Sequence, residues 1–161
     1  MSDLTEVADK TEETQDTENT EKFLIFSILG KMYCFPSRLI GEIALYDIVY
    51  QLPLIPSYVL GVVNRYSIPY ALFDIGILFY NTPTPRNKVL IFKDEIDHIA
   101  FLIDDVTGIA DISSDNIYSL ERSLDLNDLT DAVYSSFKWN EQDVFVLDVH
   151  RILERVCQET L

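Results

Sequence analysis

Short apolar runs rich in aromatic and β-branched residues recur along the chain and predict β-strands. Residues 23–28 and 32–35 flank a Leu-Gly-Lys turn and fit a hairpin. Residues 68–74 predict another strand, in which Pro69 allows pairing only at an edge or a bulge. After the proline-containing loop 81–87, further runs predict five strands: residues 88–92, 98–104, 106–112, 133–139 and 143–147. The last two form a closing hairpin.

Helical spacing of apolar residues is rarer. Leu39, Ile40 and Ile43 form a short stripe, and a second helix is predicted from Pro56 to about Asn64. Asp74 caps a short turn over residues 75–80, and Asp148 caps a final helix whose apolar positions repeat at helical spacing. Residues 48–52 are expected to be extended, because a residue before proline avoids the helical region. Many short strands with few helices indicate a mainly β fold of small barrels or a sandwich.

Composition limits both the size and the partners. The chain has 161 residues, 48% of them hydrophobic, and a formal net charge of −15. Residues 1–22 contain eight acidic residues, two lysines and no aromatic side chain, so we expect a disordered acidic tail followed by a folded region at 23–161. The negative charge disfavours nucleic acid and anionic lipid as partners. With no secretory signal and no apolar run long enough to span a bilayer, the expected location is the cytoplasm.

The sequence offers little to catalysis. It has no phosphate-binding glycine loop, no paired-cysteine motif and no metalloprotease motif. His98 and His150 have no obvious partners, and we interpret both as surface or structural residues. Cys34 and Cys157 lie in apolar settings and are predicted to be buried free thiols. The sequence thus predicts a binding protein that is not an enzyme and uses neither a metal nor a cofactor.

An ordered set of segments then points to a family. The N-terminal part contains FLIF at 23–26, the strand around Tyr33, Glu42-Ile43, Leu-Pro at 52–53, Ile-Pro at 55–56, YVLGVVN at 58–64 and the strand 68–74. The C-terminal part contains KVLIF at 88–92, FLIDDV at 101–106 and VFVLDV at 144–149. Together these segments resemble CheW, the bacterial chemotaxis coupling protein, from residue 23 to about residue 156.

The resemblance implies two intertwined five-stranded barrels, similar to Src-homology 3 barrels, with a hydrophobic core between them. It also implies a non-enzymatic adaptor that joins the regulatory domain of the histidine kinase CheA to the cytoplasmic tips of methyl-accepting chemoreceptors. Other CheW-like proteins would be further partners in an array beside the membrane. The alternative is a divergent scaffold for a different kinase or signalling complex.

The resemblance also suggests site residues. Ile40 and Ile109 fall where the family has apolar residues of a receptor-binding groove, although both could instead be core residues. Gly61 and Glu42 are assigned to the kinase contact or to its support. The largest departure is Tyr66, which stands at the position of a receptor-side arginine, with Ser67 at a family glycine. Arg65 comes one residue early, and a slip of one residue along a strand turns a side chain to the other face.

Overall fold

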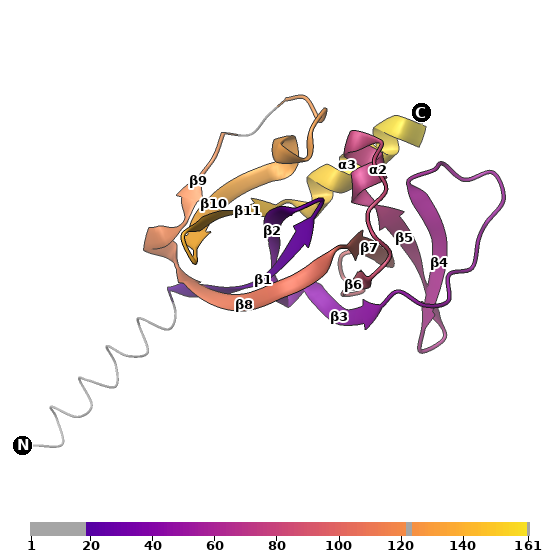
Figure 1. Cartoon of the computed structure of the whole chain (residues 1–161), viewed down its shortest axis with the longest axis horizontal. Coiled ribbons are helices and arrows are strands. Elements are labelled where there is room, and N and C mark those ends of the chain that lie inside the picture. Colours follow the sequence, from indigo (N-terminus) through magenta and orange to yellow (C-terminus); the bar gives the residue numbers. More distant parts are fainter. Residues whose placement is uncertain (1–18, 122–123, 161) are drawn as a thin grey trace, which may run out of the picture.

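The computed structural model describes residues 19–121 and 124–160 and contains two β-sheets (Figure 1). In spatial order, the first sheet contains β8 (Asp105–Ser113), β1 (Thr20–Ile28), β2 (Lys31–Pro36), β11 (Gln142–Leu147), β10 (Val133–Trp139) and β9 (Tyr118–Ser119). The second contains β3 (Ile40–Leu45), β6 (Lys88–Phe92), β7 (Ile99–Ile103), β5 (Ile68–Asp74) and β4 (Val59–Arg65). The chain leaves the first sheet after β2 and returns with β8, so the two units are intertwined.

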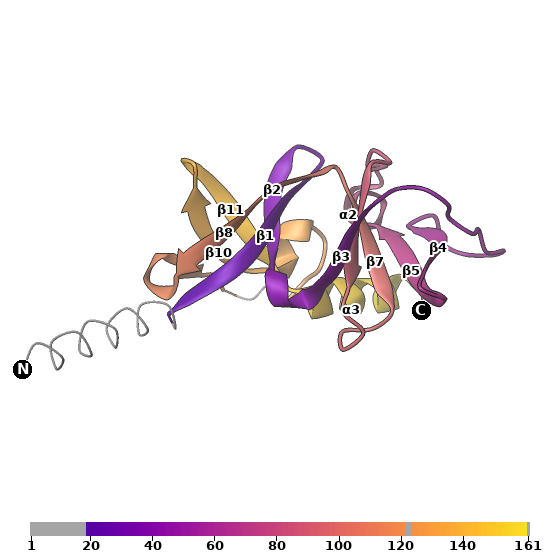
Figure 2. The ribbon, with the colours of Figure 1, turned by 90° about the horizontal axis from the view of Figure 1, so that it is seen from below.

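Two helices complete the fold. Asp74 caps α2 (Ile75–Tyr80) as predicted, because its carboxylate accepts a hydrogen bond from the backbone N–H of Ile77. The predicted C-terminal helix is α3 (Val149–Thr160). Figure 2 shows α3 running across the junction between the two sheets. It reaches α2, where the Arg155 guanidinium lies 5.9 Å from the centre of the Phe79 ring.

Three apolar clusters form the core. One lies within the first sheet around Phe137 and Val144, and another within the second around Leu72 and Leu102. The largest lies between the sheets, where the ring centre of Phe35 is 5.0 Å from that of Phe92 and 6.1 Å from that of Phe101. Alternate residues of β1, β6 and β7 enter different clusters, so both faces of these strands are buried. This explains why their sequences are continuously apolar.

The mainly β prediction is confirmed, with one difference in detail. The implied units were closed five-stranded barrels, whereas the first sheet has six strands and the hydrogen-bonded order of each sheet is open. In the second sheet, an ion pair between Glu42 on β3 and Arg65 on β4 joins the two edge strands. An isolated bridge also joins Val62 on β4 to Tyr50, which lies in the connection between β3 and β4.

Two predicted helices are wrong, since the structure has β3 where the first stripe was expected and β4 in place of the second. Each pattern was only two turns long, and pairing with β6 and β5 overrides it. The tail boundary also moves. β1 begins at Thr20, because residues 20–22 extend the ladder with β8. Residues 1–18, the rest of the expected tail, lie outside the described residues.

Of the predicted buried thiols, Cys34 is buried and Cys157 is exposed. Cys157 lies in the last turns of α3. His98 and His150 are both exposed, as predicted.

Candidate partner-binding site

A groove opens where the two sheets meet. This groove has a volume of about 230 Å³ and is lined by Leu24, Ser37, Ile40, Gly41, Glu42, Ile43 and Ile109. It therefore brings together Ile40 and Ile109, which are far apart in the sequence. Ile109 is 61% exposed, which excludes the core alternative for this residue, whereas Ile40 is half-buried and also packs against the central cluster.

The local structure of β3 and β8 explains why Ile40 and Ile109 meet at the groove. A 3₁₀ turn at Ser37–Leu39 carries the chain from β2 into β3, so Ile40 becomes the first residue of the second sheet. On the other side, β8 pairs with β1 so that Ile109 lies opposite Leu24. Residues alternate along β8, and Ile109 lies on its exposed face. The groove thus receives one wall from each sheet.

A polar pocket of about 350 Å³ adjoins the groove and shares Gly41 and Glu42 with it. The guanidinium of Arg65 donates hydrogen bonds to both carboxylate oxygens of Glu42, with 3.1 Å between Nε and Oε2. These bonds raise the pKa of Arg65. Although it comes one residue early, Arg65 lines the polar pocket that adjoins the groove. Glu42, which was grouped with Gly61, lines both the groove and the polar pocket.

Tyr66 lies at the polar pocket and not among the groove residues. It forms the β4–β5 turn with Ser67, and both have positive φ angles, 52° and 65°. Two such residues make the tight turn that suits a β-hairpin, and glycine adopts this backbone most easily. The Tyr66 ring is 88% exposed, and the Arg65 guanidinium lies 5.8 Å from its centre.

Gly61 lies beneath residues 46–58, a connection between β3 and β4 that we call the strap. Its φ is +141°, and a Cβ atom there would lie 2.3 Å from the backbone oxygen of Tyr50. Tyr50 and Val62 exchange two backbone hydrogen bonds, each of 2.8 Å. In this structure Gly61 therefore allows the strap to approach β4.

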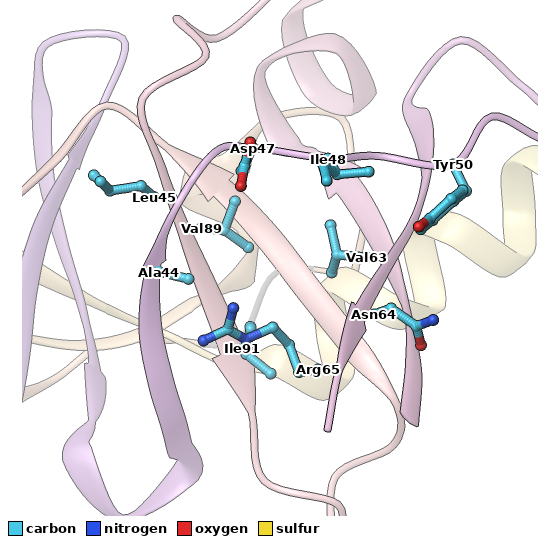
Figure 3. Close-up of a pocket in the computed structure, with 10 residues that line it drawn as sticks. All are labelled: Ala44, Leu45, Asp47, Ile48, Tyr50, Val63, Asn64, Arg65, Val89 and Ile91. Carbon is cyan, nitrogen blue, oxygen red and sulfur yellow. The ribbon is translucent and has the colours of Figure 1, made fainter. Parts of the chain in front are cut away.

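The strap carries four exposed apolar side chains: Ile48, Tyr50, Leu52 and Leu54. Figure 3 shows Ile48 and Tyr50 above a pocket of about 150 Å³, with Val63 and Val89 below. The sequence indicated that part of this segment is extended but not that its apolar residues are exposed. Four large apolar residues so close to Pro53 and Pro56 could have signalled this, since the prolines limit pairing within a sheet.

The described residues offer binding surfaces and little reactive chemistry. Within residues 19–121 and 124–160, no three His, Cys, Asp or Glu side chains gather in a way that could hold a metal ion. In the same ranges, no helix is long and apolar enough to cross a membrane.

Comparisons with known proteins identify a family and a similar fold. A family model described as CheW-like domain matches residues 22–157. Among solved structures, the scaffolding protein TtCheW from Thermoanaerobacter tengcongensis has a similar fold, with a TM-score of 0.68 and 14% sequence identity. The match covers 80% of this chain and 88% of that one. No curated protein matches the sequence.

Proposed function

The chain belongs to the CheW-like domain family, and from that premise we propose that it couples chemoreceptors to the histidine kinase CheA within a signalling array. The family and the structural relative are scaffolds that catalyse no reaction. The observation that carries the proposal is the groove, because it unites Ile40 and Ile109 between the two sheets. The protein would act in the cytoplasm, beside the membrane that holds the receptors.

The groove suits the helical tip of a receptor. An amphipathic helix binds by placing its apolar face in such a groove. Ile109 and Ile43 are 61% and 42% exposed, so both have apolar surface that a helix would remove from water. Complete burial of one such side chain contributes about 1.5–3 kcal/mol. The exposed parts of the two isoleucines together amount to about one whole side chain, so they contribute about 1.5–3 kcal/mol of the about 8 kcal/mol that a micromolar interaction requires.

The strap suits the regulatory domain of the kinase. Its exposed apolar residues form a patch on the second sheet, away from the first sheet in both views (Figures 1 and 2). Gly61 holds the strap against β4, so it would support this contact through the backbone of Tyr50. This is the supporting role that the family resemblance suggests for Gly61.

A second candidate is a scaffold for a different kinase or signalling complex. Tyr66 and Ser67 favour it, since they replace the arginine and glycine of the family pattern, and Tyr66 lines the polar pocket. The family fold would then be kept while the partner surface has changed.

Binding experiments distinguish these functions. The purified protein is titrated separately with the CheA regulatory domain and with a chemoreceptor cytoplasmic fragment. Ile109→Asp is expected to weaken receptor binding by about tenfold or more, because it places a charge in an apolar contact, and to leave kinase binding unchanged. Leu124→Asp is the matched control, since Leu124 is 97% exposed and is not a groove residue.

Each result has a defined meaning. Binding to both partners, with the receptor interaction alone sensitive to Ile109→Asp, supports the coupling function. Binding to neither partner refutes it. Failure to bind CheA, together with capture of another kinase, supports the second candidate.

A further inference from the structure

The β4–β5 turn offers a partner an aromatic ring where the family resemblance places an arginine. Tyr66 is 88% exposed at this position. Arg65 does not replace the missing cation, because its guanidinium is bound to Glu42 and lies over the Tyr66 ring. The neighbouring positive charge is therefore already neutralised within the protein.

Acidic residues lie on the other side of the polar pocket. The β6–β7 turn contributes Lys93, Asp94 and Glu95, all exposed. Asp94 is held in place, because it accepts a 2.9 Å hydrogen bond from the Tyr70 hydroxyl. Its Oδ1 also lies 3.7 Å from Nε2 of His98. With Glu42 and Arg65 paired, the remaining side chains of the pocket carry two negative charges and one positive charge.

A cation suits this combination, since it is attracted both by the face of an aromatic ring and by carboxylates. We propose that Tyr66 and Glu95 determine partner specificity by selecting a helix that carries a lysine or arginine. This helix is the receptor helix of the proposed function, on which the inference rests. Its apolar face occupies the groove, and its basic side chain lies between Tyr66 and Glu95.

The groove and the pocket are close enough for one helix to reach both. They share the lining residues Gly41 and Glu42, so they are neighbours on the surface. Consecutive turns of a helix are about 5.4 Å apart, and residues three or four apart lie on the same face. A basic residue one or two turns from the apolar anchors would therefore meet the pocket. The partner expected here is basic where a partner of the family arginine would be acidic.

Charge substitutions test whether the partner side chain that meets the polar pocket is positively or negatively charged. The probe is the chemoreceptor cytoplasmic fragment from the same organism, and its dissociation constant is measured at low and high salt. Tyr66→Arg and Glu95→Lys are each expected to weaken binding about three- to tenfold at low salt, and less at high salt. Glu141→Lys is the matched control. Glu141 lies in the β10–β11 turn on the first sheet, and this variant should bind within about twofold of the wild type.

The outcomes separate this inference from the function on which it rests. If Ile109→Asp abolishes binding but Tyr66→Arg or Glu95→Lys binds as tightly as the wild type or more tightly, the basic-partner inference is wrong and the groove remains. If the wild type binds no receptor fragment, both proposals fail. Circular dichroism of each variant verifies that a loss of binding does not reflect a loss of folding.

Discussion

Substitution of Gly61 by alanine tests whether this residue holds the strap by its backbone geometry. Alanine would have to adopt a φ of +141°, and its Cβ would lie 2.3 Å from the Tyr50 oxygen. Heavy atoms cannot approach so closely, so either the backbone of β4 or the strap must move. Displacement of the strap breaks the two hydrogen bonds between Tyr50 and Val62.

The expected loss of stability has two causes, the strained backbone at position 61 and the broken hydrogen bonds between Tyr50 and Val62. A backbone strained in this way costs about 1–3 kcal/mol. Two lost backbone hydrogen bonds add about 1–3 kcal/mol, at roughly 0.5–1.5 kcal/mol each. Gly61→Ala should therefore lower the free energy of unfolding by about 2–6 kcal/mol. This is a large part of the about 5–15 kcal/mol that is usual for a domain.

Gly30 provides the matched control. It also has a positive φ, +81°, but a Cβ atom there would meet nothing within 4 Å. Gly30→Ala thus carries only the conformational cost, about 1–2 kcal/mol. Urea unfolding compares the two variants, with the fluorescence of Trp139, the single tryptophan, and circular dichroism as probes. Two probes are needed because Trp139 lies in the first sheet and Gly61 in the second.

A loss of unfolding free energy in Gly61→Ala no larger than that in Gly30→Ala would refute the proposed role of Gly61. The strap would then tolerate a side chain, and its contact with β4 would not depend on glycine. Gly61→Asp extends the test to function, since it is expected to weaken kinase binding and stability together. Loss of kinase binding with unchanged stability would instead place Gly61 in direct contact with the kinase.

Three further outcomes are expected. A thiol reagent should modify the exposed Cys157 quickly in the native protein and the buried Cys34 only after unfolding. Burial also raises the pKa of the Cys34 thiol, so little of the reactive thiolate is present. Rapid modification of both cysteines in the native protein would contradict this. Partial burial of Tyr134, followed by the negative charge of Glu21, raises the pKa of its hydroxyl from an ordinary value near 10 to about 12, so the unfolded chain ionises first and stability should fall between these pH values. Tyr134→Phe should make that fall shallower in urea titrations over this range. Ile109→Ala should change the free energy of unfolding by less than about 1 kcal/mol, since the Ile109 side chain is already 61% exposed. A larger change measured by urea unfolding would mean that Ile109 stabilises the fold.

The strands with two buried faces were predictable from sequence. In β1, Phe23 and Ile25 enter one apolar cluster, whereas Leu24 and Phe26 enter another. Such a strand must be apolar throughout, and a short run of this kind is a strong signal. The errors lie in β3 and β4, each at the edge of the second sheet. Their mixed patterns fit two helical turns as well as a strand, and only the pairing partner decides between them.

The site was less accessible to sequence reasoning. No spacing rule relates Ile40 to Ile109, and only the family resemblance suggested that both belong to the groove. The pairing of Arg65 with Glu42 could not be derived either, because it joins two edge strands that share no backbone ladder. Long-range contacts of this kind depend on how the open sheet curves, which the local sequence does not specify.

The packing of the two sheets constrains how the proposed adaptor would transmit a signal. The groove has one wall on each sheet, whereas the strap belongs to the second sheet alone. Between the sheets, Phe35 of the first sheet packs edge-to-face against Phe92 of the second, and its ring centre also lies 6.1 Å from that of Phe101. Such close-packed interiors resist gradual sliding, so a helix that tilts in the groove would carry both sheets with it. The strap would then turn as part of one rigid body, and the kinase would sense receptor movement as a change in orientation.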